Sequence, residues 1–278
     1  MSLTDHISVI PPDVNDDPED IFAAAPGLIF TDDLRNQHGD EGDVLIYHSH
    51  RFGDIELRAA QFESENDRKL FAHYLWNAGL KMAELISGDD PKWSVKDQAV
   101  VELGAGVGLN GIVATLTGAN QVTISDYPKP ALLKNIQRNA LKAIPDELKH
   151  RYSVQGYEWG DITSPFALAH AHAFTRIVAA DCYWMPHEHE NLVRSVLHLL
   201  STASDSRVYA IAGFHTGRAK LAGFFDEAVA QGLDVEEIYE EDHVGNKRDW
   251  MKERDGGTEH VTERKKWLVV AILKRWEA

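Results

Sequence analysis

Three glycines at alternate positions, Gly104, Gly106 and Gly108, follow a short apolar run at residues 100–103 that contains Glu102. Because a helical pattern begins directly after them, this spacing predicts a buried strand that turns sharply into a helix. Glycine adopts backbone angles that other residues avoid, and without a side chain it lets a ligand approach the main chain. The chemistry expected at this turn is the binding of a nucleotide-type ligand.

A second acid separates this turn from phosphate-binding turns. Asp126 ends the next apolar run, residues 121–125, where a carboxylate can bond both hydroxyls of a ribose. The spacing is neither the G-x-G-x-x-G of NAD sites nor a phosphate loop, and no Lys or Arg lies between Glu102 and Gln121. A nucleoside without phosphates that carries a positive centre therefore fits better than NAD. S-adenosylmethionine is such a ligand.

Two further apolar runs end in side chains that could act at the same edge of a sheet. Residues 174–180 lead into Asp181, Tyr183 and Trp184, and residues 208–212 lead towards His215. Ligands of open parallel sheets bind outside the carboxyl ends of the strands, near the point where strand order reverses. We therefore expect Asp181, Tyr183 and Trp184 on the reacting side of the pocket. His215 either handles a proton or orients the nucleophile, or it only bonds loop carbonyls, and the sequence favours neither.

The ordered motifs resemble class I methyltransferases, and more narrowly methyltransferase family 16. Within that family they resemble the fungal branch labelled nicotinamide N-methyltransferase-like or elongation-factor lysine and N-terminal methyltransferase. The resemblance runs from about residue 65 to the C-terminus. It rests on residues 75–79, 102–108, 126–128, Asn135 with Asn139, 159–160, 180–184 and 212–218.

The resemblance adds roles for aromatic residues and shows two departures. It implies that Trp76 lies near the cofactor and that Trp159 lies against the adenine, which Tyr127 could also cover. Asn77 stands where the family often has proline, and Trp184 takes the tyrosine position of the family's Asp-x-x-Tyr motif. The residues expected to bind the cofactor are Trp76, Glu102, Gly104, Ala105, Gly106, Gly108, Asp126, Tyr127, Trp159 and Ala180. Those expected to be catalytic are Asp181, Tyr183, Trp184 and His215.

The expected fold class is α/β, with a doubly wound, Rossmann-like sheet of seven mostly parallel strands whose last strand is antiparallel. Residues 65–278 form this methyltransferase domain, and residues 1–64 form an N-terminal extension with a β-hairpin around Phe52. Apolar residues at helical spacing predict an amphipathic helix over residues 65–87. Residues 242–264 form a long polar link without a predicted element.

Composition limits the partners. The chain has 278 residues and a net charge of -16, which disfavours nucleic acid and permits a basic substrate, although acidity also serves solubility. Cys182 is the single cysteine, which excludes a disulfide within the chain and a thiolate zinc cluster. His187 and His189 flank Glu188, but solvated or capping histidines are the better interpretation and no metal is predicted. With no signal pattern or membrane segment, we expect a cytoplasmic enzyme.

Three functions remain open from the sequence. The first is N-methylation of a protein amine, a lysine or an N-terminal amine of a protein such as a translation elongation factor. The second is methylation of a small acceptor such as a nicotinamide-like or secondary metabolite. The third is a methyltransferase-shaped protein that transfers no methyl group. The sequence does not fix the number of methyl groups or the oligomeric state.

Overall fold

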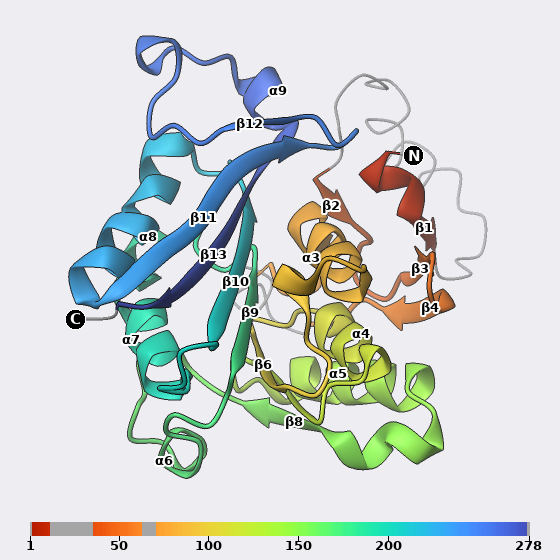
Figure 1. The fold of residues 1–278 in the computed structure, drawn as a ribbon. Coiled ribbons are helices and arrows are strands. Elements are labelled where there is room, and N and C mark those ends of the chain that lie inside the picture. The colour runs from red at the N-terminus through yellow and green to blue at the C-terminus, as the bar shows by residue number, and fades with distance from the viewer. Residues whose placement is uncertain (1, 12–35, 63–70, 277–278) are drawn as a thin grey trace.

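A central eight-stranded sheet organises the chain (Figure 1). The structure is a computed structural model that describes residues 2–11, 36–62 and 71–276. The strand order is β12-β11-β13-β10-β9-β6-β7-β8. The strands are β6 (Ala99–Leu103), β7 (Gln121–Asp126), β8 (Tyr152–Gly156), β9 (Arg176–Ala180), β10 (Arg207–Gly213), β11 (Leu233–Asp242), β12 (Lys247–Asp249) and β13 (Trp267–Arg275).

Helices cover both faces of this sheet (Figure 1). Alternate residues of one strand point to opposite faces, so Val100 belongs to the core under α3 and α4 while Val101 belongs to the core under α7 and α8. Burial on both faces explains why the central strands read as nearly continuous apolar runs. The helices are α3 (Asn77–Ser87), α4 (Leu109–Thr117), α5 (Pro130–Ala143), α6 (Pro165–Ala169), α7 (His189–Leu199), α8 (Arg218–Gln231) and α9 (Val261–Arg264). Short 3-10 turns are η1 (Leu3–His6), η2 (Pro91–Trp93), η3 (Asp146–Arg151), η4 (Pro186–Glu188) and η5 (Asp255–Gly257).

Strand order reverses at β6, which pairs in parallel with β7 on one side and β9 on the other. The doubly wound, mostly parallel sheet predicted from the sequence is confirmed, and so is the antiparallel last strand, because β13 runs antiparallel to both β10 and β11. The sequence predicted seven of the eight strands. The eighth, β12, is a three-residue edge strand on β11.

The described part of the N-terminal extension forms a separate small sheet. Strands β1 (Ile7–Ile10), β3 (Val44–Ser49) and β4 (Gly53–Arg58) pair antiparallel, and β3 with β4 is the hairpin expected around Phe52. Two-residue strands β2 (Gln37–His38) and β5 (Leu75–Trp76) pair beside it. The extension therefore reaches the segment that precedes α3.

Of the helix expected over residues 65–87, residues 77–87 are helical, and the prediction is wrong for residues 71–76. Residues 63–70 lie outside the described residues, residues 71–74 form a turn, and the helix begins only at Asn77. Phe71 has φ 51, which a helix cannot accommodate, and the next residues pair with β2 instead. Phe71, Tyr74 and Leu75, which contributed to the helical pattern, line a cavity that is described below.

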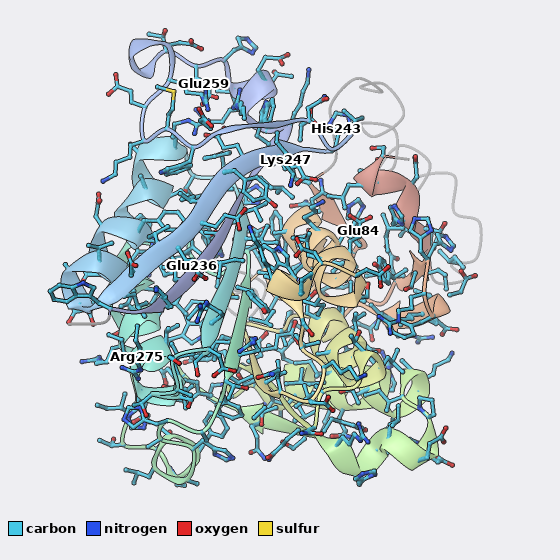
Figure 2. All side chains as sticks on the ribbon, in the orientation of Figure 1. Glu84, Glu236, His243, Lys247, Glu259 and Arg275 are labelled. Carbon is cyan, nitrogen blue, oxygen red and sulfur yellow. The ribbon has the colours of Figure 1, made fainter. Side chains whose placement is uncertain are left out.

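The segment between β11 and β13, which the sequence left as a polar link, folds over the end of the sheet. Arg218 at the start of α8 donates to Glu240 on β11 and to Glu259, labelled at the top of Figure 2, at 2.9 Å. Glu240 is fully buried, and Arg248 and Arg254 also pair with it. Within the described residues, no helix has both the length and the apolar character needed to cross a bilayer.

Candidate active site

The glycine turn after β6 requires glycine for two different reasons. Gly104, Gly106 and Gly108 all have positive φ, at 64°, 58° and 84°. A Cβ atom on Gly104 would also lie 2.8 Å from the sulfur of Cys182 and 3.1 Å from the Trp159 ring. The turn is therefore fixed in backbone angle and tightly covered by residues from two other loops.

Asp126, at the tip of β7, faces this turn. Its carboxylate accepts hydrogen bonds of 2.6 Å from the N–H of Gly106 and from the N–H of Tyr127. Burial raises the pKa of Asp126 to about 6, although both backbone hydrogen bonds lower it. A ligand that donates to this carboxylate would therefore stabilise its charged form.

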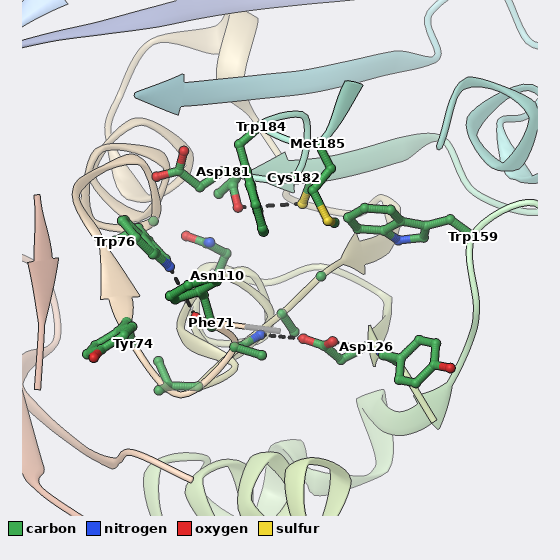
Figure 3. Close-up of a pocket in the computed structure, with 18 of the residues that line it drawn as sticks. Phe71, Tyr74, Trp76, Asn110, Asp126, Trp159, Asp181, Cys182, Trp184 and Met185 are labelled. Carbon is green, nitrogen blue, oxygen red and sulfur yellow. Dashed lines mark hydrogen bonds between the residues drawn. The ribbon is translucent and has the colours of Figure 1, made fainter. Parts of the chain in front are cut away.

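A cavity of about 370 Å³ opens at this edge of the sheet, at the carboxyl ends of β6, β7 and β9 (Figure 3). Its size lies within the roughly 300–1,000 Å³ of small-molecule pockets. Ten of the residues singled out from the sequence line it: Trp76, Gly104, Ala105, Gly106, Asp126, Tyr127, Trp159, Ala180, Asp181 and Trp184. Glu102, Gly108, Tyr183 and His215 do not.

Glu102 lies behind the glycine turn and does not line the cavity, contrary to the expectation that it binds the cofactor together with Asp126. It is buried, and its Oε2 accepts the N–H of Gly111, in the first turn of α4, at 2.8 Å. That amide has no partner within the helix, so the acid satisfies it. Burial raises the pKa of Glu102 to about 8, against the hydrogen bonds from Gly111 and Asn110. Glu102 therefore supports the turn from below.

Gly108 also lies outside the cavity lining, because it is the N-cap of α4 with left-handed backbone angles. A Cβ atom there would lie 3.1 Å from Ile136 on α5. Gly108 therefore allows α4 to begin and lets α4 pack closely against α5. It does not line the cavity.

Asp181 is the carboxylate at the other end of the cavity. Its backbone has φ 56, an angle that non-glycine residues rarely adopt and that recurs at functional sites. Its Oδ1 accepts the N–H of Gly213 at 3.0 Å, and its Oδ2 lies 3.2 Å from Nε2 of His215. The acid is thus anchored to the end of β10 while it lines the cavity.

Aromatic rings surround Asp181. The Trp184 ring meets Phe71 edge to face at 5.7 Å between centroids, and Trp76 donates from its Nε1 to the carbonyl of Phe71 at 3.3 Å (Figure 3). Indole and phenyl faces attract cations. This end of the cavity can therefore receive a cationic or amine-bearing group.

Tyr183, predicted to be catalytic, points away from the cavity. Its side chain is fully buried and stacks on Phe224 of α8 at 4.4 Å. The left-handed angle at Asp181 redirects the chain after β9, so Trp184 and not Tyr183 faces the ligand edge. The prediction for Tyr183 is corrected: it is a core residue under α8.

His215 lies one layer behind the cavity. Its Nε2 faces Asp181, and its ring lies 4.6 Å from the Trp76 ring, which does line the cavity. Burial alone would lower the pKa of His215, but the charge and hydrogen bond of Asp181 outweigh burial and raise it. The alternative role for His215 is to bond only loop carbonyls. Among the described residues, His215 makes no hydrogen bond to a carbonyl, and its hydrogen-bond partner is Asp181.

The two histidines beside Glu188 have different surroundings. His189 is buried and lies 2.9 Å from the carbonyl of Tyr183, whereas His187 is exposed at the rim of the cavity. Among the residues that the structure describes, no three His, Cys, Asp or Glu side chains gather as a metal site.

Several residues that line the cavity were not predicted from the sequence, among them Phe71, Tyr74 and Asn110. Phe71 and Tyr74 were assigned to a helix because of their spacing. Their position just before Trp76, which was expected near the cofactor, was the signal that could have identified them as cavity residues. Asn110 is a polar residue at the start of an otherwise apolar helix, and its buried Oδ1 has no hydrogen-bond partner among the described residues.

Comparison with known proteins decides the family. A family model described as lysine methyltransferase matches residues 57–228, more than half of the chain. The chain belongs to this family. The enzyme is 34% identical over 216 residues to "Protein N-terminal and lysine N-methyltransferase efm7" of Schizosaccharomyces pombe, covering 75% of this chain and 78% of the relative.

A second relative and one solved structure are also similar to this chain. The enzyme is 35% identical over 172 residues to the protein of the same description in Candida glabrata, covering 61% of this chain and 66% of that one. TYW2 of Pyrococcus horikoshii, solved in complex with MeSAdo, shares the fold. Its TM-score is 0.52 at 16% identity, covering 87% of this chain and 74% of that one.

The enzyme is a methyltransferase that depends on S-adenosylmethionine, and its cavity fits that donor. The glycine turn lines the cavity, Asp126 offers oxygens to ribose hydroxyls, and Asn110 Oδ1 can accept a hydrogen bond that the described residues leave unmade. The N-terminus of α4 adds partial positive charge suited to a carboxylate. When bound, the donor supplies a methyl group made electrophilic by its sulfonium.

Proposed function

We propose that this enzyme methylates a protein amine, the side chain of a lysine or an N-terminal amine, on a protein such as a translation elongation factor. The observation that carries the proposal is the acceptor end of the cavity. There Asp181 stands among Trp76, Trp184 and Phe71, on a chain whose relatives are described as protein N-terminal and lysine methyltransferases.

The residues at this end do modest chemistry. A carboxylate at Asp181 can accept a hydrogen bond from an amine and orient its lone pair, while the aromatic rings exclude water and tolerate positive charge. An amine must lose its extra proton before it can react. Correct placement alone can lower a barrier by roughly 7 to 11 kcal/mol, so a strong dedicated base is unnecessary.

An experiment with labelled methyl donor distinguishes a protein acceptor from a small-molecule acceptor. The enzyme is incubated with a protein extract of a fungal host and, separately, with a small-molecule extract. We expect label on lysine or N-terminal amines of a protein, and its loss with Asp181→Asn. Label confined to small molecules would favour a metabolite acceptor, which the aromatic walls of the cavity also suit. We place the reaction in the cytoplasm, where translation factors are found.

A further inference from the structure

We propose that His215 is a positioning residue for methyl transfer, which holds Asp181 and Trp76 at the acceptor end of the cavity without reaching the cavity itself. The inference rests on the proposed function only in that the acceptor is an amine. Its structural part, the coupling of His215 to Asp181, stands independently.

The first step is that the backbone of β10 holds Asp181 through two hydrogen bonds. Its N–H donates to the carbonyl of Ile211 at 2.8 Å, and its Oδ1 accepts the N–H of Gly213 at 3.0 Å. Both partners are backbone groups at the end of β10. The first contact fixes the main chain of Asp181 and the second fixes one carboxylate oxygen, Oδ1. The other oxygen, Oδ2, is left to be oriented by the Nε2 of His215 at 3.2 Å.

The second step is that His215 touches both walls of the acceptor end. Its ring lies 4.6 Å from the Trp76 ring, and its side chain is only 20% exposed. Asp181 and Trp76 come from segments more than a hundred residues apart and do not share a strand. One imidazole ring therefore sets the spacing between the carboxylate and the indole.

The third step explains the glycine at position 213. Its φ is not in the left-handed region, so backbone angle does not require glycine there. A Cβ atom would instead lie 2.6 Å from Nε2 and 2.8 Å from Cε1 of His215. Gly213 thus leaves the space that the ring needs to reach Asp181.

Charge gives the arrangement a pH dependence. The charged groups that act on His215 are Asp181, which raises its pKa, and Lys265, which lowers it, together with burial. Neutral His215 donates from Nε2 and leaves the charge of Asp181 free to attract a cationic amine. Protonation places a positive charge beside Asp181, so attraction for the acceptor should weaken as the pH falls.

Three variants test the role: His215→Ala, His215→Gln and Gly213→Ala. Gln can place an amide N–H near the position of Nε2 but does not titrate, and Gly213→Ala displaces the ring while the histidine remains. A control variant, His198→Gln, changes a half-buried histidine whose ring contacts the carbonyl of Ala167. Rates are measured on purified fungal translation elongation factor, and donor affinity is measured with S-adenosylhomocysteine.

We expect His215→Ala and Gly213→Ala to lower kcat/KM for the protein by about 10²-fold, the cost of misplacing a reacting group by about 1 Å. Donor affinity should change less than about threefold, because His215 does not line the cavity. With the donor at saturating concentration, His215→Gln should recover most of the rate and lose the part of the acidic limb that His215 contributes. An equal loss of donor affinity in His215→Ala, or an unchanged rate and pH profile, would overturn the proposal.

A second measurement does not depend on the acceptor. Titration of ¹⁵N-labelled imidazoles by NMR should place the midpoint of His215 lower in Asp181→Asn than in the parent enzyme. If the parent enzyme labels no protein, the proposed function fails and this titration alone decides on His215. An identical midpoint in both proteins would then show that the two side chains are not coupled.

Discussion

At the scale of single residues, two carboxylates at one sheet edge serve different partners. Asp126 is held by backbone amides at the donor end, and Asp181 is held by Gly213 and His215 at the acceptor end. A third acid, Glu102, lies behind them and supports α4. The three acids thus bond different partners: Asp126 the glycine turn, Asp181 the end of β10 and His215, and Glu102 the first turn of α4.

Donor binding should depend on the charge of Asp126. Its pKa is raised to about 6, and ribose hydroxyls donate best to the charged form. Affinity should therefore strengthen as the pH rises through 6 and weaken below it, by up to about tenfold per pH unit. Calorimetric titration with S-adenosylhomocysteine between pH 5 and 8 measures this. The slope should disappear in Asp126→Asn, and a slope that persists there would assign it to another group.

Glu102→Gln should become more stable than the parent enzyme as the pH rises. The pKa of Glu102 is about 8 in the folded state against an ordinary value of 4.5. Stability from the protonated acid is therefore fully present below 4.5 and is lost as the pH rises towards 8. Urea unfolding at pH 5 and pH 8 should show a difference that widens in favour of the glutamine variant. A constant difference would mean that Glu102 does not titrate in this window.

At the scale of elements, the glycine turn and the segment after β11 illustrate two ways of fixing an active-site edge. The turn depends on backbone angles and close contact with Cys182 and Trp159. The segment depends on Glu240, which is fully buried and paired with several arginines. Each makes its own prediction.

Gly104→Ala should abolish detectable donor binding, because its Cβ would lie 2.8 Å from the Cys182 sulfur at a position with φ 64. The matched control is Gly53→Ala in the β3–β4 hairpin, where φ is 73 and no atom lies within 4 Å. That control should lose only about 1 kcal/mol of unfolding free energy. Calorimetry and urea unfolding separate the two effects, and equal donor affinity in both variants would contradict a role for the tight turn.

Glu240→Ala should lower the free energy of unfolding by about 3–5 kcal/mol, because it leaves buried guanidinium charge without its main partner. Glu236→Ala, which breaks the more exposed pair with Arg207, should cost less than about 1 kcal/mol. Urea unfolding compares them directly. If both variants lost the same small amount, the buried network would not be what holds the segment.

The elements show what a sequence can and cannot predict. The central parallel strands followed from apolar runs, because parallel strands buried on both faces admit few polar residues. β12 could not be predicted, since Lys247–Asp249 is polar and depends on pairing with β11. The turn at residues 71–74 was mistaken for helix because residues that line a cavity and residues that line a core have the same apolar character.

The site residues also divide into those that the sequence could predict and those that it could not. Strand ends and glycine spacing located Gly104, Gly106, Asp126 and Asp181, because topology fixes where strand ends meet. The direction of a side chain one residue beyond a strand was not predictable. Tyr183 lies in the core and Trp184 lines the cavity because of the left-handed angle at Asp181, which no residue type announces.

At the scale of the whole molecule, we propose that the cavity at the carboxyl ends of β6, β7 and β9 has a donor end and an acceptor end. The donor end comes from β6 and β7, and the acceptor end from β9 and β5, so strand-order reversal at β6 brings them together. The net charge of -16 suits an encounter with a basic protein surface. The central claim is that donor binding depends on the Asp126 end of the cavity and not on the Asp181 end.

Calorimetric titration of S-adenosylhomocysteine at pH 7.5 into the parent enzyme, Asp126→Asn and Asp181→Asn tests that claim most directly. We predict binding to the parent enzyme, affinity at least about tenfold weaker in Asp126→Asn, as expected for loss of charged hydrogen bonds, and nearly unchanged affinity in Asp181→Asn. Equal affinity in all three proteins, or loss in Asp181→Asn with retention in Asp126→Asn, would contradict this division of the cavity.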